Sequence, residues 1–121
     1  MDLRGQPRYH RGVAYGQLGK LDLGVADLTR AIDLDPSEAI GYQDRGNLRI
    51  QQGEFDLAIA DLTKAIELQP KATRALALRG FARARTGDAV GATTDFERAR
   101  ALTTDPNEIR FIETTRSLAG L

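Results

Sequence analysis

The sequence contains no cysteine, a single histidine and no excess of charge of either sign. Without cysteine, the chain has no disulfide framework, no thiolate zinc site and no cysteine nucleophile. Its 17 basic and 17 acidic side chains cancel, so it lacks the electrostatic footprint of a protein whose main partner is a nucleic acid. These absences argue against several classes of enzyme and against a polyanionic ligand.

Long apolar segments are also missing. No run of about 18 apolar residues occurs, so no membrane span is predicted. The first twelve residues, MDLRGQPRYHRG, lack the apolar segment of a signal peptide. We therefore expect a soluble, cytoplasmic protein, unless the chain is a fragment of a larger one.

One segment of the sequence is repeated with a period of 34 residues. ADLTRAIDLDP at residues 26–36 is similar to ADLTKAIELQP at residues 60–70, and a more divergent copy, TDFERARALTT, begins at residue 94. The third copy places its Asp-Pro pair two residues late, at Asp105 and Pro106. A constant period is the signature of an array of stacked structural units.

Each copy has the pattern of a pair of helices. Apolar residues recur in steps of three and four along one stripe, and no segment alternates like a strand. A central glycine (Gly19, Gly53 or Gly87) can end one helix in a left-handed conformation, and a proline stops the second helix. The pattern predicts first helices near residues 7–18, 38–52 and 71–86, and second helices near 21–34, 55–68 and 89–102.

Small residues mark where the paired helices must approach closely. They are Gly12, Gly46 and Gly80 on the first helices, with Gly24, Ala58 and Ala92 facing them. A single pair cannot bury both of its apolar faces, so neighbouring pairs must stack. Residues 107–119 have an apolar stripe on one side only, which predicts a helix that covers the end of the stack.

The glycines, alanines, prolines and period together resemble the tetratricopeptide repeat, whose pattern is W-x2-L-G-x2-Y, A-x3-F and P. The second copy reads Tyr42, Gly46, Ala58, Leu62, Ala65 and Pro70. The resemblance implies an all-α, right-handed superhelix forming one domain over residues 1–121. It would contain three helix-turn-helix repeats (about 5–38, 39–72 and 73–106) and a capping helix at about 107–119. It also implies a non-enzymatic scaffold that binds a peptide or protein segment in its concave groove.

The chain departs from the family pattern at two positions of every repeat. The leucine before the first glycine is Arg in every copy, and an Asp follows sixteen residues later: Arg11 with Asp27, Arg45 with Asp61, Arg79 with Asp95. We interpret these as ion pairs between the helices of one repeat or of adjacent repeats; two separately solvated charges are the alternative. Arg49 and Arg83 stand where the family usually has an aromatic residue, which predicts looser packing there.

In the family, the first helices line the concave face. The positions that map to it here are Tyr9, His10, Val13, Gln17, Gln43, Asp44, Asn47, Ile50, Arg74, Leu78, Phe81 and Arg85. Ile50, Leu78 and Phe81 are expected to form an exposed apolar group that needs a partner, unless helix packing buries them.

One subset of the family grips the C-terminal carboxylate of chaperones with Lys, Asn, Asn, Lys and Arg. The corresponding residues here are Tyr9, Val13, Asp44, Arg74 and Leu78. Only Arg74 is chemically similar, and Asp44 would repel a carboxylate. We therefore predict no binding to such acidic tails.

Catalysis and metal binding find little support in the sequence. His10 precedes Asp44 by one full repeat, so the two can be neighbours, but no nucleophile, phosphate loop or second histidine accompanies them. The arginines at 74, 79, 83 and 85 lack an aromatic stacking platform for nucleic acid. We expect no enzymatic activity, cofactor, metal, nucleic-acid or membrane partner. The alternative function is self-assembly into homo-oligomers, through the groove or a terminal helix.

Overall fold

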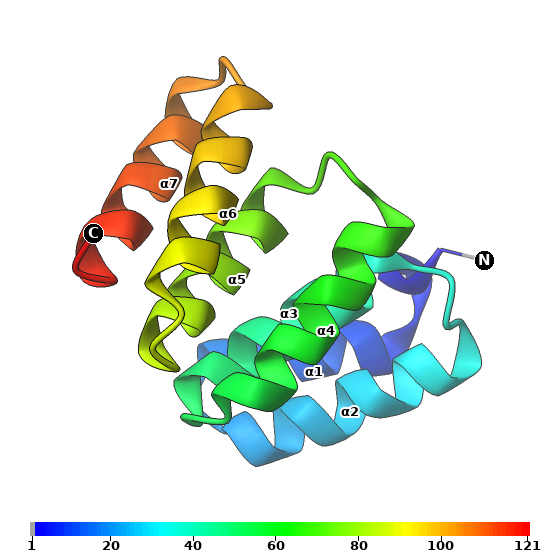
Figure 1. The fold of residues 1–121 in the computed structure, drawn as a ribbon. Helices are drawn as coiled ribbons and strands as arrows, with labels where there is room; N and C mark the ends of the chain where they lie inside the picture. Colours follow the sequence, from blue (N-terminus) through cyan, green and yellow to red (C-terminus); the bar gives the residue numbers. More distant parts are fainter. Residues whose placement is uncertain (1) are drawn as a thin grey trace.

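The computed structural model describes residues 2–121, and helices are the only regular elements in that range. A short 3-10 turn, η1 (Leu3–Gly5), precedes α1 (Pro7–Gln17), α2 (Leu21–Leu34), α3 (Ala39–Gln51), α4 (Phe55–Leu68), α5 (Thr73–Arg85), α6 (Ala89–Ala101) and α7 (Pro106–Leu118). Consecutive helices pair as α1 with α2, α3 with α4 and α5 with α6, and the pairs stack in order (Figure 1). The predicted superhelix of three helix pairs and a capping helix is confirmed.

The turn inside each pair is built on a glycine with positive φ. Gly19, Gly53 and Gly87 have φ values of 77°, 78° and 91°. In the second pair the Glu54 N–H donates to the Arg49 carbonyl at 2.8 Å, which closes the end of α3. Nothing lies within 4 Å of a Cβ added at Gly53, so the backbone conformation, and not lack of space, requires glycine there.

The small residues of the first helices allow the paired helices to touch. A Cβ added at Gly46 would lie 2.8 Å from Leu62 Cγ, and one added at Gly80 would lie 3.0 Å from Phe96 Cε2. Both distances are shorter than ordinary carbon contacts. The predicted close approach of the paired helices is therefore confirmed.

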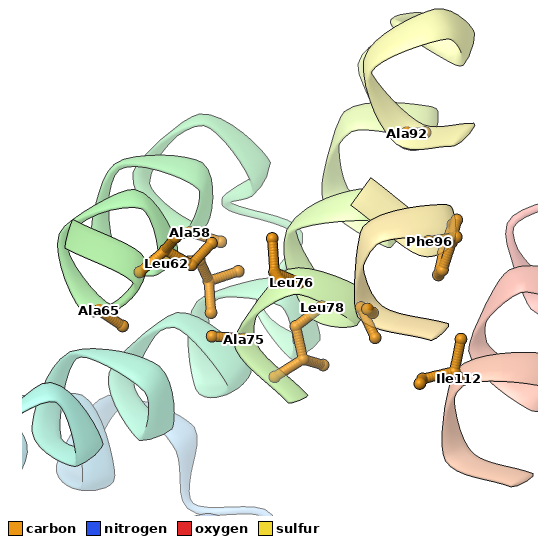
Figure 2. Close-up of a cluster of buried hydrophobic side chains, with 12 residues drawn as sticks. Ala58, Leu62, Ala65, Ala75, Leu76, Leu78, Ala92, Phe96 and Ile112 are labelled. Atoms are coloured by element: carbon orange, nitrogen blue, oxygen red, sulfur yellow. The ribbon is translucent and has the colours of Figure 1, made fainter. Parts of the chain in front are cut away.

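The larger of two apolar clusters surrounds α5. It joins Leu62 of α4, Leu76 of α5, Phe96 of α6 and Ile112 of α7 (Figure 2). The smaller cluster joins α1, α2 and α3 and includes Leu3, which is fully buried although it lies before the first repeat helix. Because α4, α6 and α7 all pack on α5, this helix has little exposed surface left.

Each repeat contains the predicted Arg–Asp ion pair, and each pair joins the two helices of one repeat. Arg45 donates from Nε to Asp61 Oδ2 at 2.9 Å and from Nη2 to Asp61 Oδ1 at 2.7 Å, a bidentate geometry. The pairs of Arg11 with Asp27 and of Arg79 with Asp95 have the same two bonds.

Arg49 and Arg83 each add a second cation to the carboxylate of the ion pair in their repeat. Arg49 Nη1 donates to Asp61 Oδ2 at 2.7 Å, and Arg83 Nη1 donates to Asp95 Oδ2 at 3.0 Å. Each lies four residues, about one helical turn, after the first arginine and so reaches the same side. The spacing of four residues between the two arginines, present in both the second and the third repeat, could have predicted this shared carboxylate from the sequence.

The arginines also connect adjacent repeats. Arg45 Nη1 donates to Thr29 Oγ1 at 3.2 Å, and Arg79 Nη1 donates to the equivalent Thr63 Oγ1 at 3.3 Å. Within residues 2–121, Arg11 donates to no threonine of another repeat, and its side chain is 61% exposed, whereas that of Arg79 is 11% exposed. The ion pairs therefore become more buried from the first repeat toward the third.

Candidate peptide-binding groove

The first helices α1, α3 and α5 follow one another along one side of the array. Between α1 and α3 the surface is hollowed into a cavity of about 400 Å³, which we call the α1–α3 pocket. Its lining residues are Val13, Gly16, Gln17, Leu28, Asp44, Asn47, Leu48 and Gln51. The pocket thus brings together four of the residues assigned to the groove from sequence, namely Val13, Gln17, Asp44 and Asn47.

Leu48 forms part of the pocket wall because two small residues, Gly16 and Gly24, leave room for its side chain. The sequence analysis did not predict this contact. A Cβ added at Gly16 would lie 2.5 Å from Leu48 Cδ2, and one added at Gly24 would lie 2.7 Å from Leu48 Cδ1. The Leu48 side chain therefore occupies the space that two glycines leave open. The signal was present, because 34 residues further on the equivalent positions hold Ile50 and Ala58 in place of the two glycines and Ala82 in place of Leu48.

Asp44 is held inside the pocket by a neutral partner. The Tyr9 hydroxyl donates to Asp44 Oδ2 at 2.5 Å. Burial raises the pKa of Asp44 above its ordinary value, and the Tyr9 hydrogen bond and the charge of Arg74 only partly oppose that rise. Burial and the same hydrogen bond raise the pKa of Tyr9, so it stays a neutral donor.

His10 does not contact Asp44. Its ring lies edge-on to the Tyr9 ring, with 5.6 Å between the centroids, and its side chain is exposed. The Tyr9 side chain is buried, so its ring is not available to a ligand. Tyr9 affects the groove only by its hydrogen bond to Asp44. The conceivable His10–Asp44 contact is replaced by a Tyr9–Asp44 hydrogen bond.

Three amide side chains that line the pocket with Asp44 have no hydrogen-bond partner within residues 2–121. Gln17, Asn47 and Gln51 line the pocket, and none of them forms a side-chain hydrogen bond with residues 2–121. Gln43 is half-buried on the same helix as Asp44 but does not line the pocket. Each free amide offers one acceptor oxygen and two N–H donors to a ligand.

The expected exposure of the apolar group Ile50, Leu78 and Phe81 is wrong for Leu78, which helix packing buries. Leu78 is 8% exposed and belongs to the core cluster, as Figure 2 shows. Ile50 and Phe81 are half-buried and pack against the same cluster. α7 packs against α5, and Ile112 of α7 belongs to the same core cluster as Leu78.

The two groove arginines of α5 stay exposed and lie against aromatic rings. The guanidinium carbon of Arg74 lies 4.0 Å from the centroid of the Phe111 ring, and that of Arg85 lies 5.4 Å from the centroid of the Phe55 ring. Both distances are within the range of cation–π attraction. Arg74 is thereby tied to the capping helix at the end of the groove.

Within residues 2–121, no three His, Asp or Glu side chains gather in a way that would hold a metal ion. No helix in the same range combines the length and the apolar character needed to cross a bilayer.

Comparison with known protein families decides the relationship of the chain. A model described as "Tetratricopeptide repeat" matches residues 6–38, and one described as "TPR repeat" matches residues 46–87. The chain belongs to the tetratricopeptide repeat family. A comparison with curated protein sequences gave no match.

Solved tetratricopeptide repeat structures match this chain over nearly its whole length. The TPR2B domain of yeast Sti1, in its pHsp70 complex, has a TM-score of 0.85 and 26% identity, and the match covers 93% of each chain. The TPR domain of Arabidopsis OM64 has a TM-score of 0.81 and 26% identity, with 91% of this chain and 92% of that chain covered. The second TPR domain of human RPAP3, in complex with the HSP70 peptide SGPTIEEVD, has a TM-score of 0.80 and 25% identity, with 90% of this chain and 92% of that chain covered.

The tetratricopeptide repeat is a protein-interaction fold, and this chain is a protein-interaction scaffold.

The five positions aligned with the carboxylate-gripping residues of that chaperone-binding subset do not form a basic cluster here. Tyr9 and Asp44 are hydrogen-bonded to each other, and Leu78 is buried in the core. Val13 lines the α1–α3 pocket, and Arg74 is the single cation among the five. The shared fold therefore carries a different set of side chains in the groove.

Proposed function

We propose that the concave groove binds an extended segment of another protein, with the α1–α3 pocket as its central contact. The observation that carries this proposal is the pocket itself, an open cavity of about 400 Å³ lined by three amide side chains that form no side-chain hydrogen bond within residues 2–121. Polar groups without partners at a concave surface are typical of a binding site.

The amides of the pocket favour a peptide main chain as the ligand. Asn47 and Gln51 lie one helical turn apart on α3, and Gln17 faces them from α1. Side-chain amides can accept from a peptide N–H and donate to a peptide carbonyl at the same time. Ile50 and Phe81 add apolar surface toward the third repeat. His10, Gln43, Arg74 and Arg85 belong to the same proposed surface.

Selection from a library of random twelve-residue peptides displayed on phage tests the proposal. Peptides that bind the wild-type protein should lose most of their affinity for Asn47→Arg, because the larger cation fills the pocket. Thr114→Arg is the matched control, since it adds the same side chain at an exposed position of α7. A library that yields no binder, or binders that tolerate Asn47→Arg, would contradict the proposal.

Self-assembly is the second candidate, and the exposed leucines at the two ends favour it. Leu18 at the end of α1 is 71% exposed, and Leu118 at the end of α7 is 72% exposed. Burying both in a contact between copies would remove apolar surface from water. Light scattering over a dilution series decides the matter, because a monomer at every concentration excludes this candidate. A cytoplasmic location and the absence of enzymatic activity stay predictions of the scaffold hypothesis.

A further inference from the structure

Asp44 differs from the aspartates of the ion pairs in how its charge is compensated. Asp27, Asp61 and Asp95 are buried, and each receives a bidentate arginine. No arginine or lysine within residues 2–121 lies at ion-pair distance from Asp44, whose hydrogen-bond partner is the neutral Tyr9 hydroxyl. A partly desolvated carboxylate without a cation is costly to keep.

Arg74 is the protein cation that acts on Asp44 from a distance. Its charge opposes the rise in the pKa of Asp44, but its guanidinium is placed on the Phe111 ring and forms no ion pair with the carboxylate. Asp44 Oδ2 accepts from Tyr9, and Oδ1 has no protein donor in residues 2–121. One oxygen of the carboxylate is therefore available to a ligand.

The pocket around Asp44 offers apolar walls for the methylene stem of a long basic side chain and polar groups for its charged end. Val13 and Leu48 give the pocket apolar walls, against which a methylene stem can pack. Gln17, Asn47 and Gln51 line the same pocket, and each carries an amide oxygen that can accept a hydrogen bond. An ammonium has three N–H donors and a guanidinium has five, so one carboxylate and neighbouring amide oxygens can satisfy either group.

On the basis of the proposed function, we propose that the α1–α3 pocket receives one lysine or arginine side chain of the bound peptide, with Asp44 as its counter-ion. The ligand preference is then opposite in sign to that of the solved relative whose bound peptide ends in EEVD. The cation satisfies the free oxygen of Asp44, which explains why an uncompensated carboxylate faces the groove.

The peptides selected on the wild-type protein provide the test. We expect an aligned lysine or arginine in the selected sequences, and its replacement by alanine should weaken binding about 10-fold or more, as for the loss of a charged hydrogen bond. The Asp44→Asn protein should bind the parent peptide more weakly by a similar factor. It should bind the alanine-substituted peptide with the same affinity as the wild-type protein does. Comparing lysine and arginine versions of one peptide identifies which cation fits better.

The control variant is Asp33→Asn, which removes an exposed carboxylate of α2 outside the pocket and should not change affinity. Melting followed by circular dichroism checks that Asp44→Asn is folded, and the alanine peptide tests the same contact on the unaltered protein. Binders that lose affinity for Asn47→Arg but contain no basic position, or that bind Asp44→Asn equally well, would overturn this inference and leave the proposed function intact. Failure to select any groove-dependent peptide would remove both.

Discussion

The ion pairs inside the repeats allow one pair type to be compared at different degrees of burial. In the second repeat, Asp61 accepts from Arg45 and Arg49, whose side chains are 14% and 18% exposed. In the first repeat, Asp27 accepts from Arg11, whose side chain is 61% exposed. Asp61→Ala and Asp27→Ala remove the same group from these two environments.

The expected cost differs because the arginines left behind differ. Asp61→Ala leaves two largely buried guanidinium groups without a counter-ion, which should lower the free energy of unfolding by about 3–5 kcal/mol. Asp27→Ala releases one guanidinium that already contacts water, so the loss should be about 1–2 kcal/mol. Arg45→Ala should cost less than Asp61→Ala, because Arg49 still donates to the carboxylate. For a domain of this size, a loss of about 3 kcal/mol lowers Tm on the order of 10 °C.

Urea unfolding followed by far-ultraviolet circular dichroism measures these differences, and a double-mutant cycle on Arg45 and Asp61 isolates the coupling of the pair. The coupling energy should be about 2 kcal/mol, and the same cycle on Arg11 and Asp27 should give a smaller value. Equal losses for Asp61→Ala and Asp27→Ala would refute the argument from burial. So would a coupling of Arg45 with Asp61 below about 0.5 kcal/mol, since this is the level of an exposed pair.

Four further outcomes follow from the contacts. Gly46→Ala should lower the free energy of unfolding in urea by about 1–3 kcal/mol, because its Cβ would lie 2.8 Å from Leu62 Cγ. Leu48→Ala should cost about 2–5 kcal/mol in the same assay by leaving a cavity beside two glycines. Asp44→Asn should raise the free energy of unfolding at neutral pH, because folding desolvates a charge there; this gain should shrink as the pH falls through the raised pKa of Asp44, where the wild type binds a proton. The peptide SGPTIEEVD should show no affinity by fluorescence anisotropy at physiological salt, since Asp44 repels its carboxylates.

Each of these outcomes has a matched control or a contrary result. Gly5→Ala should be nearly neutral, because nothing lies within 4 Å of an added Cβ. A Leu48→Ala variant as stable as the wild type would mean that the two glycines close the gap by helix movement. If Asp44→Asn is less stable than the wild type at neutral pH, then the Tyr9 hydrogen bond outweighs desolvation. Saturable binding of the acidic peptide would contradict the charge argument.

Local patterns predicted the elements of the fold closely. The observed helix bounds depart from the predicted ones by two residues at most, because apolar spacing and turn glycines act over a few residues. The Arg–Asp pairs were also predictable, since the same two residue types recur sixteen positions apart in every repeat. The second arginine of Asp61 was not predicted, although its spacing of one helical turn was visible.

The groove was only partly predictable, because its residues are defined by neighbours in other repeats. Leu78 was assigned to an open surface, but it lies in the core cluster that α5 shares with α4, α6 and α7. Tyr9 and Asp44 are 35 positions apart, and their hydrogen bond forms only when α1 and α3 are side by side. The Leu48 side chain fits beside Gly16 for the same reason.

The sequence by itself determined the period, the helix pairs, the turns and the family, because each is written in residues close along the chain and repeated three times. The tertiary structure decided which side chains remain free for a partner. Stacking buried Leu78 and Tyr9 and left Asp44 facing a pocket that no arginine or lysine lines. That outcome depends on which helix covers which, and contacts between distant segments are set by packing and not by local pattern.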